Sequence, residues 1–249
     1  MIEQTVEIPA SDAAIPTFIV HPERDGPHPV VLMLMDGQGM REELRVMARR
    51  LAAVGYYVMA PNLYHRQGVR EVAPREGEPD EAENQRIYGL IASLSNPMVL
   101  EDCDHLLDFA DRDPAASPGR AGVVGYMMSG AHAVRVAARH PERIGAVAAI
   151  CGKQLVTDQD DSPHRVLGRA RAEFYFAWAE RDEWAPLETA EALEQAAKAQ
   201  SASAEVEVYE QARNGFVFVR QGHYDGACAE RHWERIFSLF QRRLRLERR

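Results

Sequence analysis

The chain has 249 residues, 46% of them hydrophobic, which is enough for one substantial core; α/β folds of this length commonly form a single domain. Its net charge of −9 argues against nucleic acid, and we interpret the one basic cluster, 242–249, as a solvated helix end. Three scattered cysteines show no metal-ligand spacing, no apolar run approaches the roughly 20 residues of a membrane span, and no signal-peptide core is visible. We therefore expect a cytoplasmic protein that binds no metal, membrane or nucleic acid.

Apolar, β-rich segments alternate with helical patterns along the chain. The segments "TVEI" (5–8) and "TFIV" (17–20) predict an opening hairpin. Further strands are predicted at 30–35, 56–62, 121–126, 146–151, 173–179 and 206–210. Several are apolar throughout rather than alternating, which is typical of strands covered by helices on both faces. This order predicts an α/β fold with a mainly parallel sheet and right-handed crossovers.

Two apolar stripes at helical spacing predict helices that pack on this sheet. Their members are Leu44, Met47, Ala48, Leu51 and Ala52, and near the other end Ala229, Trp233, Ile236, Phe237 and Phe240. Residues 63–97 interrupt the pattern, because they are charged and rich in Gly and Pro at first and helical afterwards. Such an excursion after a strand is either a mobile surface loop or a partial cap over a site. We otherwise expect residues 1–249 to form one domain without repeats.

The stretch "GVVGYMMSG" (122–130) contains a strand, a tight turn and the start of a helix predicted at 129–140. Gly125 and Ser129 are the small residues of a small-x-nucleophile-x-small turn, the nucleophile elbow. The nucleophile position therefore falls on Met127. A thioether cannot attack a carbonyl and then leave again.

Nearly the whole chain resembles the dienelactone hydrolase family of α/β-hydrolases. "VVLMLMDGQG" (30–39) is similar to the family's first strand and loop, and "GVVGYMMSG" to its elbow, usually GYCMGG. "EFYFAWAERDEWAP" (173–186) resembles the strand and turn of the triad acid, and "YEQARNGFVF" (209–218) the segment that usually ends in HGF. "AERHWERIFSLF" (229–240) resembles the closing helix. The resemblance implies the α/β-hydrolase fold.

That family uses a Cys–His–Asp triad, which is incomplete here. The resemblance places Met127 at the nucleophile, Asn214 at the histidine and Asp182 at the acid. Methionine sulfur has no proton to lose, and a neutral amide cannot accept a proton near pH 7. The two replacements, at both ends of one proton path, suggest that the covalent route has been abandoned.

The oxyanion hole of this fold consists mostly of backbone, so it does not depend on the nucleophile. The implied donors are the N–H groups of Met128, at a helix N-terminus, and of Gly37. Asp36 stands beside Gly37, where the family has an acidic residue. A half-buried Asp36 is predicted to have a raised pKa and to act as a general acid or base. The alternative is that its carboxylate only accepts N–H bonds that fix the loop.

Further residues are predicted to line the substrate pocket: Met35, Tyr64, Arg66, Tyr88 and Trp184. The two tyrosines and Arg66 are candidates to hold a substrate carboxylate or carbonyl, although surface solvation explains Arg66 equally well. Methionines around the elbow would make the site apolar. Ser129 is more readily an N-cap than a nucleophile, and Cys151 a buried inert thiol.

The sequence favours a cofactor-free enzyme of noncovalent acid–base chemistry acting on a small apolar carbonyl-type substrate. Cyclisation, isomerisation, hydration, elimination and water-mediated lactone hydrolysis all fit an oxyanion hole with Asp36 as the proton carrier. The alternatives are an ester or lactone hydrolase with a relocated nucleophile, a non-catalytic pocket for a small ligand, and a deliberate mutant of an active hydrolase. A requirement for Asp36 in turnover would distinguish the acid–base enzyme from the non-catalytic binding protein.

Overall fold

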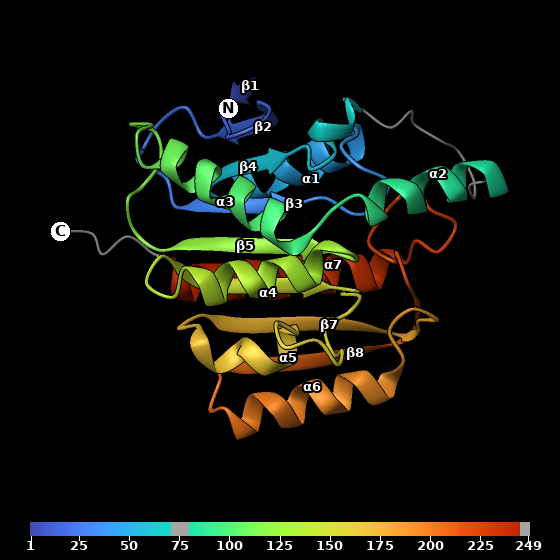
Figure 1. The fold of residues 1–249 in the computed structure, drawn as a ribbon. Coiled ribbons are helices and arrows are strands. Elements are labelled where there is room, and N and C mark those ends of the chain that lie inside the picture. The colour runs from blue at the N-terminus through green and yellow to red at the C-terminus, as the bar shows by residue number, and fades with distance from the viewer. Residues whose placement is uncertain (71–79, 245–249) are drawn as a thin grey trace.

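The computed structural model describes residues 1–70 and 80–244, and these residues form one eight-stranded sheet of order β1-β2-β4-β3-β5-β6-β7-β8 (Figure 1). The strands are β1 (Ile2–Ile8), β2 (Ile15–His21), β3 (Val30–Leu34), β4 (Tyr57–Pro61), β5 (Ala121–Tyr126), β6 (Ile144–Ile150), β7 (Glu173–Arg181) and β8 (Ala204–Arg213). β1 pairs antiparallel with β2, and β2 with β4, whereas the pairs from β4 to β8 are parallel. The predicted hairpin and the mainly parallel sheet are confirmed.

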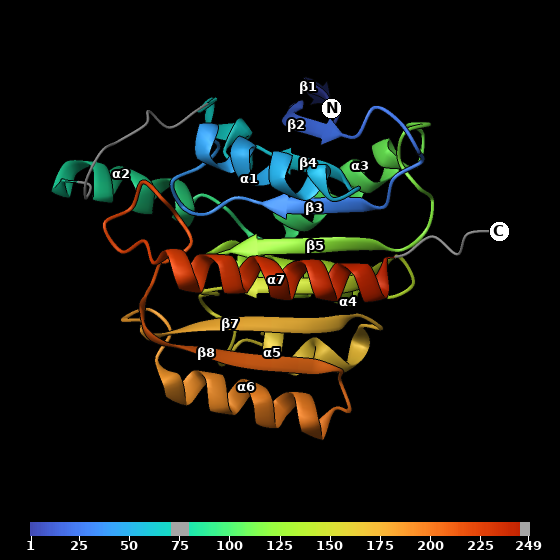
Figure 2. The same cartoon turned by 180° about the vertical axis from the view of Figure 1, so that it is seen from behind.

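Helices cover both faces of the sheet. They are α1 (Glu42–Ala53), α2 (Glu81–Ala92), α3 (Asn96–Ala110), α4 (Ser129–Arg139), α5 (Pro163–Val166), α6 (Leu187–Ala199) and α7 (Gly226–Arg243), with short 3-10 turns η1 (His65–Gln67) and η2 (Leu167–Arg169). α3 and α4 lie on one face, and α1 and α7 on the other (Figures 1 and 2). No helix in the described part of the chain is long and apolar enough to cross a membrane.

The two predicted apolar stripes are the faces that pack on the sheet. All five residues of the first are buried in α1, and of the second only Phe237 is partly exposed in α7. β3, β5 and β6 are buried along their entire length, because helices cover them from both sides. Because these three strands run parallel to one another, their carboxyl ends lie at the same edge of the sheet.

The excursion at 63–97 begins with η1 and continues into α2, and residues 71–79 of it lie outside the described residues. The Asp80 carboxylate caps α2 by accepting the N–H of Glu83. α2 lies beyond the carboxyl ends of β3 and β5 (Figure 1). The predicted cap would be built on this helix.

Candidate active site

The turn between β5 and α4 keeps the backbone geometry of an elbow. Met127 has a φ of 50°, a left-handed conformation that costs a non-glycine residue about 1–3 kcal/mol. A Cβ on Gly125 would lie 2.2 Å from the carbonyl oxygen of Ser129, so only glycine fits there. The Met127 N–H donates to the Ile150 carbonyl at 2.8 Å, and its carbonyl accepts the N–H of Lys153 at 3.0 Å. The elbow is thus held on both sides although its tip carries a thioether.

Ser129 ties the elbow to the end of β3. Its buried hydroxyl donates to the Met35 carbonyl at 2.5 Å. The predicted N-cap role is therefore wrong: Ser129 is the first residue of α4, whose N-cap position is Met128, and no side chain caps that end. The hydroxyl can reach the Met35 carbonyl because β3 and β5 are paired in parallel and end side by side. The Ser129 hydroxyl donates its proton to a backbone carbonyl, and no basic side chain contacts it among the described residues. Ser129 is therefore not activated as a nucleophile.

Cys151 also offers no relocated nucleophile. It is buried, as predicted, and burial raises the pKa of its thiol to about 12. The thiolate, which is the reactive form, is therefore scarce near neutral pH. The buried His132 and His232 do not supply a charged partner either, since burial lowers their pKa values to about 4 and about 3.

Tyr64 connects the two predicted oxyanion donors. The side chain is fully buried, and its hydroxyl donates to the Gly37 carbonyl at 2.8 Å and lies 3.6 Å from the Met128 sulfur. Burial, reinforced by Asp36, raises the pKa of Tyr64, so the hydroxyl remains a donor. This contact fixes the peptide of Gly37 beside the start of α4.

The N–H groups of Gly37 and Met128 have no hydrogen-bond partner among residues 1–70 and 80–244. A Cβ on Gly37 would lie 2.8 Å from the Cδ1 of Ile91, so α2 closes over this loop. The Met128 N–H lies at the N-terminus of α4 and the Gly37 N–H lies on the loop after β3. Unpaired backbone donors of this kind are candidates to stabilise a carbonyl oxygen or an oxyanion.

Asp36 is fully buried, not half-buried as predicted, and it belongs to an ion-pair network. Its oxygens lie 2.5 Å and 3.3 Å from the Arg41 guanidinium, and the Gln221 amide reaches it at 3.5 Å. Arg41 also pairs with Glu43 at 2.9 Å. Burial alone would lower the pKa of Arg41, but the charges of Asp36 and Glu43 raise it. A permanent cation beside a carboxylate stabilises its ionised form, which is the form that a proton acceptor needs, but the same attraction weakens the carboxylate as a base.

Asp182 and Asn214, the predicted acid and histidine positions, are joined by a hydrogen bond. One Asp182 oxygen accepts the N–H groups of Trp184 and Ala185 at 2.9 Å and 3.2 Å, and the other accepts the Asn214 amide at 2.6 Å. Asp182 is thus bound by a neutral amide, which cannot act as a base near pH 7. A cavity of about 330 Å³ adjoins these residues.

Lys153 is a residue of the site that the sequence reasoning missed. Its Nζ lies 4.0 Å from the centroid of the Trp184 ring, and the charges of Asp182 and Asp36 act on it. A signal was available, because Lys153 is one of only two lysines among the 29 Lys and Arg residues of the chain. It also follows β6 by three residues, at the carboxyl edge of the sheet where ligands bind in α/β folds.

Two aromatic residues stand at the mouth of the site. Trp184 is 54% exposed and Tyr88, on α2, is 42% exposed, and their ring centroids are 5.9 Å apart. Met35 is buried at the end of β3, and Met127 is partly buried. The predicted pocket residues except Arg66 thus gather around the elbow.

Arg66 lies elsewhere. Its guanidinium pairs with Asp102 at 2.9 Å and with Asp12 at 2.6 Å. These partners belong to α3 and the loop between β1 and β2, so the described contacts hold Arg66 away from the pocket. The ion pairs, rather than surface solvation or substrate, account for this arginine.

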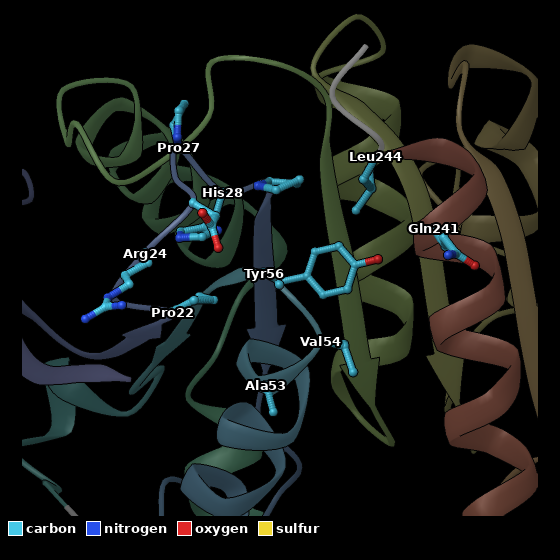
Figure 3. Close-up of a pocket in the computed structure, with 12 residues that line it drawn as sticks. Pro22, Arg24, Pro27, His28, Ala53, Val54, Tyr56, Gln241 and Leu244 are labelled. Carbon is cyan, nitrogen blue, oxygen red and sulfur yellow. The ribbon is translucent and has the colours of Figure 1, made fainter. Parts of the chain in front are cut away.

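A larger cavity, about 1280 Å³, opens at the opposite end of the sheet (Figure 3). It lies where β3 and β4 begin, and its lining includes Arg24, His28, Tyr56 and Gln241. None of the predicted site residues reaches it. Its size therefore does not mark the candidate active site, which lies at the carboxyl ends of β3, β5 and β6.

Comparison with known proteins identifies the family of the chain. The family model for the dienelactone hydrolase family matches residues 15–244. The chain is 30% identical over 240 residues to the "Putative carboxymethylenebutenolidase" of Escherichia coli K12, covering 94% of this chain and 84% of that protein. A relative of the same name from Synechocystis is 25% identical and covers 96% of both chains.

Solved structures agree with this result. The crystal structure of a "Putative Dienelactone Hydrolase" from Klebsiella pneumoniae superposes with a TM-score of 0.85 at 27% identity, covering 96% of this chain and 98% of that one. The fold also matches a dienelactone hydrolase-like promiscuous phosphotriesterase from metagenomic libraries, with a TM-score of 0.81 at 19% identity. The resemblance found in the sequence is confirmed: the chain belongs to the dienelactone hydrolase family and has the α/β-hydrolase fold.

Proposed function

We propose that this chain is a dienelactone-hydrolase-like enzyme that opens small apolar lactones or esters without a covalent intermediate. The Gly37 and Met128 N–H groups would bind the carbonyl oxygen, and Asp36 would take a proton from the attacking water. The observation that carries the proposal is that both N–H groups are unpaired among residues 1–70 and 80–244. The resemblance assigns the nucleophile and base positions to Met127 and Asn214, which cannot perform those roles.

The names of the relatives favour hydrolysis of a lactone over the other reactions that the site suits. Cyclisation, isomerisation, hydration and elimination need the same two parts, a polarised oxygen and a proton acceptor. The methionines and Trp184 around the elbow favour a small apolar substrate, because thioether and indole surfaces offer few hydrogen bonds. Removal of a single oxyanion donor typically lowers kcat of an acyl-transfer enzyme by about 10²–10³-fold.

The test is turnover of a panel of activated esters, lactones and enol lactones by the native chain and by Asp36→Asn. We expect the substitution to lower kcat/KM by about 100-fold or more, because the amide cannot accept the proton from water. Glu43→Gln is the matched control, since it removes one carboxylate from the same Arg41 network without touching the Gly37 loop.

Hydrolysis that survives Asp36→Asn would point to an unrecognised nucleophile. An equal loss in Glu43→Gln would assign the effect to the ion-pair network as a whole. Absence of turnover by the native chain would contradict the hydrolytic proposal and direct the search to ligands that the pocket retains.

A further inference from the structure

The loop after β6 delivers Lys153 to the elbow through a constrained backbone. Cys151 and Gln154 have φ values of 48° and 55°, left-handed conformations that non-glycine residues adopt only where the surroundings impose them. A Cβ on Gly130 would lie 2.8 Å from the Cα of Gly152, so the loop packs backbone against backbone on the start of α4. The Lys153 N–H bond to Met127 completes this attachment. The position of the lysine is therefore tied to that of the elbow.

The amino group of Lys153 is not engaged in an ion pair within the described part of the chain. The nearby carboxylates are already occupied: Asp182 accepts two backbone N–H groups and the Asn214 amide, and Asp36 is bound by Arg41. The ammonium instead lies over the face of Trp184. Its protons remain available to a ligand in the site.

Partial burial makes this lysine a better acid than an ordinary one. Burial lowers the pKa of Lys153, and the charges of Asp182 and Asp36 oppose that shift without cancelling it. Arg41 pairs with Asp36 and neutralises much of its charge. An ammonium with a lowered pKa gives up its proton more readily near neutral pH.

We propose that Lys153 is the proton donor to the leaving oxygen in the reaction proposed above, and this inference rests on that function. Water would lose a proton to Asp36 as its oxygen bonds to the carbonyl carbon, and the Gly37 and Met128 N–H groups would hold the resulting oxyanion. As the bond from carbon to the leaving oxygen breaks, its electron pair stays on that oxygen, which takes a proton from the Lys153 ammonium. The protonated Asp36 and neutral Lys153 then return to their starting forms by proton exchange through solvent.

The dependence of the rate on the leaving group distinguishes proton donation by Lys153 from binding of the substrate by its positive charge. A nitrophenolate leaves without protonation, whereas the alkoxide of an alkyl ester or a saturated lactone needs a proton. We expect Lys153→Met to lower kcat about 100-fold or more on alkyl esters and lactones, with little effect on nitrophenyl esters. Lys153→Arg should not rescue the loss, because a guanidinium keeps its proton. Lys198→Met, at the chain's other lysine on an exposed face of α6, is the matched control.

Equal losses on both substrate classes, or rescue by arginine, would overturn the proposal and make Lys153 a binding cation. Turnover that is insensitive to Asp36→Asn would contradict the proposed function instead, and no turnover by the native chain would contradict both proposals.

Because the chain has two lysines, selective ¹³C labelling gives two side-chain Cε signals. The Lys153 signal should titrate at lower pH than that of Lys198, and turnover of alkyl esters should fall as pH rises through the same range. A Lys153 signal that titrates no lower than Lys198 would also contradict the proposal.

Discussion

Replacing Met127 with Cys and Asn214 with His in the same chain is expected to create a thiol-dependent esterase. The elbow already holds residue 127 at a φ of 50°, and the Asp182 oxygen already accepts a hydrogen bond from residue 214 at 2.6 Å. We expect the double variant to exceed the native rate on nitrophenyl esters by about 10³-fold or more, because nucleophile, base and acid act as one unit. Burst kinetics and inactivation by iodoacetamide would measure the acyl-enzyme and its thiol.

The single variants provide the comparison. Met127→Cys alone has no base to activate its thiol, and Asn214→His alone has no nucleophile, so each should remain near the native rate. Asp182→Asn in the double variant should remove most of the gain, because the histidine loses the partner that orients it. A folded double variant that shows no burst would mean that the elbow tip has moved too far from residue 214 to support covalent catalysis.

Arg41→Met is expected to lower the free energy of unfolding by about 3–5 kcal/mol, because it leaves buried carboxylates without their cation. Arg41 binds both Asp36 and Glu43, and all three side chains are buried. Its guanidinium also lies 4.9 Å from the centroid of the Phe218 ring. Urea denaturation followed by circular dichroism would measure the loss.

Arg171→Met is the matched control for this destabilisation. Arg171 pairs with Glu142 at 2.7 Å, yet both side chains are more than half exposed. An exposed ion pair contributes about 0–1 kcal/mol, so the control should remain close to the native stability. A loss below about 1 kcal/mol in Arg41→Met would show that Asp36 and Glu43 are solvated or protonated when the arginine is removed.

The elements that sequence patterns predicted are those whose signal is local. The buried strands and the two helical stripes follow from runs of apolar residues, and the elbow from the small residues around Met127. The family motif placed Asp182 and Asn214 in one site, and the structure joins them by a hydrogen bond at 2.6 Å. These strands, helices and the elbow could be predicted without knowledge of contacts between distant parts of the chain.

The misjudged residues depend on contacts that the sequence does not encode locally. The partners of Arg66, Asp102 and Asp12, are 36 and 54 residues away, so its ion pairs appear only when the chain is folded. Lys153 reaches the site through a loop whose left-handed residues have no glycine signal. The burial of Asp36 likewise requires the pairing with Arg41, which sequence reasoning did not anticipate.

The two contacts beside the proposed oxyanion donors both end on main-chain carbonyls, from Ser129 to Met35 and from Tyr64 to Gly37. Neither contact involves the side chain at position 127 or 214. Substitutions at those two positions therefore leave both contacts in place, so the side chains that attach the loop after β3 are separate from the side chains that the resemblance assigns to the nucleophile and the base.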